Sequence, residues 1–128
     1  MLRGATTHKA RAVQARDFTG LRYGNITPTD IDALIEYKDK AYILIETKYK
    51  NAEMPYGQKL ALERICDDLQ KTKPTLLILA THNYEVGEEI DFAHCMVEKY
   101  RYKGFWKPPG KIPNVRQLID SFIESVDK

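Results

Sequence analysis

The sequence predicts an α/β fold, a central mixed sheet of four to five strands flanked by helices. Three observations support this prediction. Two apolar strands form a hairpin between residues 26 and 50, an amphipathic helix follows them, and a continuously apolar run, residues 75–80, comes after the helix. A hairpin is antiparallel, whereas a buried strand reached through a helix is typical of a parallel crossover, so the sheet is mixed.

One domain accounts for residues 1–128. A chain of this length buries enough surface to fold without disulfides or structural metals. The sequence is 43% hydrophobic and 30% charged, which is ordinary for a soluble globular protein, and no apolar run reaches the roughly 18 residues of a membrane span. The first residues contain no apolar signal-peptide core, so we expect a cytoplasmic protein.

Composition also limits the kinds of site. Cys66 and Cys95 lack the CxxC spacing of zinc sites and redox motifs, so we interpret both as small core residues. The formal net charge is only +2. Nucleic-acid binding therefore cannot be inferred from bulk charge and depends on local basic patches.

The first elements are a short helix and the hairpin. Residues 6–18 predict the helix, with a threonine as N-cap and Gly20 after its end. The first strand begins near Asp30 and ends at Tyr37, and the second follows a polar turn. Apolar residues occur on both faces of both strands, so we expect a central hairpin that is covered on two sides.

The register of the hairpin decides whether its charged residues meet. A loop of three residues, 38–40, sets Asp32 opposite Glu46 and Asp30 opposite Lys48, so that all four side chains share one face. A loop of two residues without a bulge would scatter them onto opposite faces. The loop contains no glycine for a left-handed position, which leaves its turn type open.

Three further elements follow. A helix from Pro55 to about Gln70 has an apolar face that carries Gln58 at its N-terminal end, where the amide either reaches the site, caps the helix or satisfies a backbone group at the sheet edge. Residues 75–80 form a buried strand parallel to the second. Residues 92–103 predict another strand, and residues 114–126 a last amphipathic helix.

The clustered charges are typical of a divalent-metal site for phosphodiester cleavage. Mg²⁺ or Mn²⁺ prefers oxygen ligands, which Asp30, Glu46 and the backbone carbonyl of Thr47 could supply, with Asp32 as the alternative carboxylate. Lys48, on the same face as Glu46, could orient or deprotonate the attacking water. The alternative for Glu46 and Lys48 is a solvent-facing ion pair of little energetic consequence.

These residues resemble a known family. Pro28-Thr29-Asp30, followed by Glu46-Thr47-Lys48 at a strand end, is similar to the core motif of the PD-(D/E)XK nuclease superfamily, over roughly residues 26–70. The resemblance implies a restriction-endonuclease-like core in which the Asp and Glu bind the metal and the Lys takes part in catalysis. Gln58 is similar to a helical glutamine near the active site of some branches.

The resemblance leaves the metal-binding aspartate open. Thr29 separates the proline from Asp30, and Asp32 follows, so either aspartate could be the ligand. Asp30 is favoured, because members with a similar Asp-hydrophobic-Asp string generally use the first. The short chain resembles stand-alone phage nucleases and Holliday-junction resolvases, which commonly form homodimers.

We therefore expect a magnesium-dependent DNA nuclease with Asp30, Glu46, Lys48 and Gln58 in its active site. The alternatives are a structure-selective, resolvase-like endonuclease and a non-catalytic nucleic-acid-binding subunit with the same fold. Four cations could contact the nucleic-acid backbone: Lys50, Lys99, Arg101 and Lys103. The last three alternate with tyrosines, a pattern that equally fits an edge strand guarded by lysines.

Overall fold

The computed structural model describes residues 15–112 and 114–128. Its elements, in chain order, are η1 (Thr19–Leu21), β1 (Ala33–Tyr37), β2 (Ala41–Tyr49), α2 (Tyr56–Gln70), β3 (Thr75–His82), η2 (Phe92–His94), β4 (Met96–Tyr102), β5 (Phe105–Lys107) and α3 (Val115–Asp127). The expected helix over residues 6–18 falls mostly outside the described residues. Its last four residues, 15–18, are irregular and lead into the single 3-10 turn η1.

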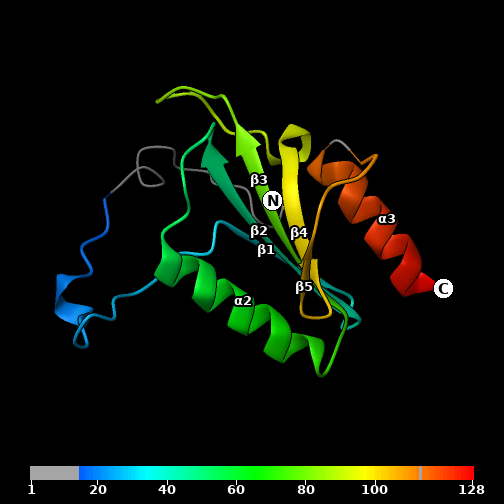
Figure 1. Ribbon diagram of the computed structural model, residues 1–128, viewed down its shortest axis with the longest axis horizontal. Coiled ribbons are helices and arrows are strands. Elements are labelled where there is room, and N and C mark those ends of the chain that lie inside the picture. The colour runs from blue at the N-terminus through cyan, green and yellow to red at the C-terminus, as the bar shows by residue number, and fades with distance from the viewer. Residues whose placement is uncertain (1–14, 113) are drawn as a thin grey trace.

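The strands form one five-stranded sheet in the order β1-β2-β3-β4-β5. Only the β2/β3 pair, joined through α2, is parallel, and the other neighbours are antiparallel. The two helices lie on opposite sides of this sheet (Figure 1). The predicted mixed α/β sheet is thus confirmed, as is the parallel strand after the helix.

Each helix covers a separate layer of the core. On the α2 side, Leu44 and Leu77 of the sheet pack with Leu62 and Cys66 of the helix. On the α3 side, the apolar face of α3 covers a larger cluster that includes Ile43, Ile78 and Cys95. Both cysteines are buried and unpaired, as predicted. No helix within the described residues is long and apolar enough to cross a membrane.

The register of the hairpin is the one that a three-residue loop requires. Ala33 pairs with Ile45 and Tyr37 with Ala41, which confirms the prediction that even positions face even ones. The loop has no glycine, and Lys38 and Asp39 themselves adopt positive φ angles of 49° and 60°. Two ordinary side chains therefore occupy the left-handed region that glycine usually takes.

Two expectations for the hairpin are wrong. The first strand begins at Ala33, so Asp30 and Asp32 precede it, because the chain bends at Asp32 and leaves the ladder. The expected covering on both sides is also wrong for β1, an edge strand in which Leu34 is 56% exposed, whereas it holds for β2, which is buried on both faces. The reason is that α2 packs over β3 and β4 and leaves the same face of β1 open.

The second half of the sheet is more irregular than the sequence predicts. The strand expected over residues 92–103 begins only at Met96, after the 3-10 turn η2, and the chain returns as the short strand β5. The pairing of β3 with β4 shifts between Leu79 and Ala80, which leaves Glu98 as an extra residue in a β-bulge. The last helix matches its prediction, with Asn114 as a side-chain N-cap.

Candidate functional site

Glu46 is the buried carboxylate at the centre of the predicted cluster. Its residue is 6% exposed and lies in β2, opposite Leu79 of β3, on the sheet face that α2 covers. Oε1 accepts a hydrogen bond of 2.7 Å from Nε2 of Gln58, and Oε2 accepts one of 3.3 Å from the backbone N–H of Asp32. Hydrogen bonds to both oxygens thus fix the orientation of the Glu46 carboxylate.

Asp32 places a second carboxylate beside Glu46. Where the chain bends out of β1, Asp32 Oδ2 accepts hydrogen bonds from the backbone N–H of Thr47, at 2.8 Å, and from its hydroxyl, at 3.2 Å. Thr47 lies in β2 beyond the last residue pair of β1 and β2, Ala33 with Ile45. The side chain of Asp32 therefore accepts the backbone hydrogen bond of a strand residue that has no partner in β1. Thr47 contributes through these two donors, and a metal-binding role for its carbonyl stays a prediction.

The pair of carboxylates is electrostatically strained. Burial, followed by the negative charge of Asp32, raises the pKa of Glu46 to about 7, although the hydrogen bond from Gln58 favours the charged form. Two carboxylates this close repel each other, and burial weakens the hydration of Glu46, whereas Asp32 is exposed. A bound cation would relieve both costs, and a strongly shifted group of this kind is a marker of functional sites.

Asp30, the favoured metal ligand of the sequence argument, has different contacts. Its carboxylate accepts a hydrogen bond of 2.8 Å from Arg16, and its side chain is 44% exposed. Only its backbone carbonyl faces the cluster, at 3.5 Å from Nε2 of Gln58. The structure therefore brings Asp32, the alternative ligand, to Glu46.

Gln58 lies at the site and does not cap its helix. Pro55 is the N-cap of α2 and makes no side-chain capping bond. The amide of Gln58 instead connects α2 to Glu46 and to the segment before β1. Of the three roles open to Gln58 in the sequence, the structure shows two: the contact with the carboxylate of Glu46 and a hydrogen bond to the backbone carbonyl of Asp30, before the edge strand β1.

Lys48 lies on the same face of β2 as Glu46, two residues further along the strand. It forms an ion pair with a residue that the sequence does not predict as its partner. Its Nζ lies 2.9 Å from Oε1 of Glu98, and its side chain is only 17% exposed. Glu98 reaches it from the β-bulge of β4. No sequence pattern predicts this contact, because a bulge has no signature in an alternating strand pattern.

The predicted nucleic-acid contacts fall into separate regions. Lys99 and Arg101 lie on the α2 face, whereas the tyrosines between them pack into the α3-side core. Lys50 follows the C-terminal end of β2, where its Nζ lies 3.9 Å from Oε1 of Glu85, and Lys103 lies over the ring of Tyr102 in the β4–β5 turn. The alternation therefore does not form one continuous basic strip.

The carboxylate pair fits a hard divalent cation. Within residues 15–112 and 114–128, no group of three or more His, Cys, Asp or Glu side chains is arranged to hold a metal. Asp32 and Glu46 supply two oxygen donors, which is the usual share of the protein for Mg²⁺, since this ion keeps several waters and takes others from substrate phosphate. The donor set excludes the thiolate and imidazole chemistry of a structural zinc site.

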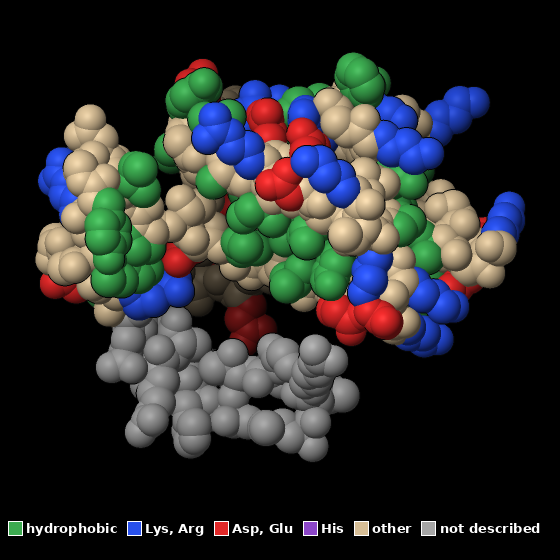
Figure 2. Space-filling view, turned by 90° about the horizontal axis from the view of Figure 1, so that it is seen from below, with side chains coloured by type: hydrophobic (Ala, Val, Ile, Leu, Met, Phe, Trp, Pro, Cys, Tyr) green, Lys and Arg blue, Asp and Glu red, His purple; other side chains and the backbone are tan. Residues whose placement is uncertain are grey.

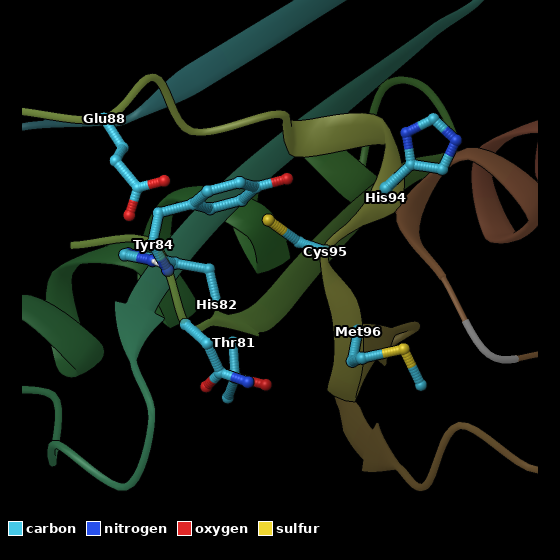
Figure 3. A pocket seen from close by; sticks show the side chains of 8 residues that line it. Thr81, His82, Tyr84, Glu88, His94, Cys95 and Met96 are labelled. Atoms are coloured by element: carbon cyan, nitrogen blue, oxygen red, sulfur yellow. Dashed lines mark hydrogen bonds between the residues drawn. The ribbon is translucent and has the colours of Figure 1, made fainter.

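A separate cavity of about 320 Å³ lies at the C-terminal end of β3. Figure 3 shows its lining, in which Tyr84 and Cys95 point toward each other across the space. His82 in its wall accepts a hydrogen bond of 3.1 Å from the backbone N–H of Tyr84 and packs edge-on against Tyr49. These contacts give His82 a structural role.

Comparisons with known proteins do not identify the chain: no protein-family model matches it, and no curated protein or solved structure shows significant similarity to it.

Proposed function

We propose that this protein is a nuclease that hydrolyses phosphodiester bonds in DNA and depends on Mg²⁺ or Mn²⁺. The observation that carries the proposal is the buried carboxylate of Glu46, which lies beside the exposed Asp32 and is oriented by Gln58, with Lys48 next along the same face of β2. The carboxylate pair is poorly stabilised without a cation, and a paired lysine beside it serves phosphate chemistry better than core packing.

Each residue of the site has a distinct role. Asp32 and Glu46 would hold the metal, which, when bound, supplies Lewis acidity and neutralises charge at the scissile phosphate. Gln58 fixes the orientation of the Glu46 carboxylate through Oε1. Lys48 donates its N–H groups to the attacking water or to the phosphate oxygens, and Glu98 holds its ammonium group in place.

Cleavage assays with matched variants test this proposal. Purified protein is incubated with linear, circular and branched DNA, in Mg²⁺, in Mn²⁺ and in chelator. We expect cleavage only with metal, and a loss of about 100-fold or more in Asp32→Asn, Glu46→Gln and Lys48→Ala. Asp30→Asn and the exposed loop variant Glu53→Gln should keep the activity.

Some outcomes would contradict the proposal. Cleavage that persists in chelator, or that survives Glu46→Gln, rules out the site. A loss of activity in Asp30→Asn with full activity in Asp32→Asn would reverse the assignment of the aspartates. Binding of DNA without any cleavage would instead favour the non-catalytic subunit, and preferential cutting of branched DNA would favour the resolvase-like activity.

A further inference from the structure

Three cations surround the ring of Trp106 on the α2 side of the sheet. Nζ of Lys99 lies 4.6 Å from the centre of the ring, Nζ of Lys59 lies 5.8 Å away, and the guanidinium carbon of Arg101 lies 5.9 Å away. The indole N–H donates a hydrogen bond of 3.2 Å to Glu63 of α2. The ring is thereby fixed between helix and sheet, with cations around it.

Only one of these cations is neutralised. Arg101 forms two hydrogen bonds with Asp67, of 2.9 Å and 2.8 Å. Among the described residues, neither Lys59 nor Lys99 has a carboxylate oxygen within the 4.0 Å of an ion pair. The surface seen in Figure 2 carries interspersed positive and negative side chains and no broad basic field, so an unneutralised pair of lysines is a local feature.

The positive charges of Lys59 and Lys99 also repel each other. The pKa of Lys99 is lowered, mainly by burial and secondly by the positive charge of Lys59. The charge of Lys48 also lowers this pKa, and the charge of Glu98 partly offsets the effect. Cation–π contact with an indole is weak for an exposed cation, so it does not by itself account for two lysines placed on one ring. An anion between the two ammonium groups would remove their repulsion.

The lysine pair is aligned with the carboxylate site. Glu46 pairs with Leu79, and Leu79 pairs with Lys99, so these residues form one row across the α2 face. Two interstrand spacings separate Glu46 from Lys99, about 10 Å. Lys59 follows Gln58 directly in α2. The distance between Glu46 and Lys99 is short enough for one nucleic-acid strand to contact the carboxylate site and the lysine pair through phosphates that are close together in its backbone.

We propose that Lys59, Lys99 and Trp106 form a phosphate-binding site for the backbone of DNA, which holds a phosphate near the one at the carboxylate pair. The inference rests on the proposed function for its ligand. Because cations already lie around the indole, Trp106 serves to hold the lysines and not to stack a base. The site therefore contacts the backbone and has no preference for sequence.

The test compares two double variants that remove the same charge. Lys59→Ala with Lys99→Ala removes the proposed site. Lys38→Ala with Lys107→Ala is the matched control, because each of these lysines also lies over an aromatic ring, that of Tyr37 at 5.3 Å and that of Tyr102 at 5.7 Å. A second pair, Lys59→Gln with Lys99→Gln, keeps the side-chain length, and circular dichroism checks the fold of all variants.

Binding is measured in chelator, so that no DNA is cleaved. A labelled single-stranded oligonucleotide is titrated at several salt concentrations. We expect the Lys59/Lys99 variants to bind about tenfold or more weakly, and the slope of log affinity against log salt to fall by about 1.4, for two lost phosphate contacts. Trp106 is the only tryptophan of the chain, so its fluorescence should change when DNA binds the wild type.

The outcomes separate this inference from the nuclease proposal. Unchanged affinity and salt slope in the Lys59/Lys99 variants, an equal loss in the control, or a wild type that binds no DNA would each overturn the phosphate site. Cleavage is assayed separately in Mg²⁺. A wild type that cleaves while the variants bind normally leaves the nuclease intact, and selective loss of binding without any cleavage supports the phosphate site alone.

Discussion

At the scale of single residues, Glu46 shows how a strand position becomes reactive. A glutamate at a strand end is unremarkable in sequence, and its surroundings alone raise its pKa, through burial and the facing Asp32. Sequence reasoning found Glu46, Lys48 and Gln58, because residue type and spacing identify them. It favoured Asp30 over Asp32 on the family resemblance, and the bend that turns Asp32 toward Thr47 is a tertiary feature that no local pattern shows.

The raised pKa of Glu46 makes stability depend on pH in a defined direction. The folded protein holds this proton up to about pH 7, whereas the unfolded chain releases it near 4.5. In chelator, the free energy of unfolding therefore falls as the pH rises from 4.5 to 7. The stabilisation that comes from protonated Glu46 in the folded state is lost above pH 7.

Glu46→Gln tests this dependence, because the amide cannot ionise. Between pH 4.5 and pH 7, the free energy of unfolding of this variant should rise relative to that of the wild type by about 3 kcal/mol in total. Urea unfolding at several pH values measures the difference, with Glu53→Gln as the control. Parallel curves of stability against pH for wild type and Glu46→Gln would contradict the burial of Glu46 beside a second carboxylate.

At the scale of elements, the turn between β1 and β2 has a strained backbone, because its left-handed positions are not occupied by glycine. Lys38 and Asp39 both have positive φ angles, which cost an L-residue about 1 kcal/mol or more. Lys38→Gly should stabilise the protein by about 0.5 kcal/mol, after the entropy that glycine loses on folding. Thermal unfolding measures the gain.

The control for the turn is Lys111→Gly, at a loop position whose φ is not positive. This variant should gain nothing. If both variants change stability alike, the effect comes from the lost lysine and not from the backbone conformation. The register of the hairpin was predictable from the loop length, whereas its left-handed residues were not, because no glycine marks them.

A second element-scale contact ties α2 to β4. Arg101 is held by two hydrogen bonds to Asp67, and its side chain is only 14% exposed. Asp67→Ala should cost about 2 kcal/mol, because a partly buried guanidinium loses its partner. The exposed pair Arg116 and Asp120 in α3 is the comparison, and Asp120→Ala should cost less than about 0.5 kcal/mol. Equal losses in urea unfolding would contradict the importance of burial.

At the scale of the whole molecule, the two core layers share one sheet and should unfold together. Leu77 and Ile78 are neighbours in β3 that face α2 and α3 respectively, and both are buried. Leu77→Ala and Ile78→Ala should each cost about 2–5 kcal/mol, from lost burial and the cavity left behind.

The unfolding of both variants is followed with two probes. Fluorescence of Trp106 reports on the α2 side, and far-ultraviolet circular dichroism reports on both helices. Coincident transitions are the expected result for one cooperative domain. A fluorescence transition that precedes the circular dichroism transition would show that the α2 layer, and with it the candidate site, opens independently.

The sequence by itself determined the α/β class, the hairpin register and three residues of the candidate site, because hydrophobic periodicity and loop length act locally along the chain. Tertiary structure decided the rest. The packing of α2 over β3 and β4 left β1 as an open edge, the bend at Asp32 chose the second carboxylate, and the β-bulge brought Glu98 to Lys48. These contacts join residues distant in the chain, so no local pattern encodes them.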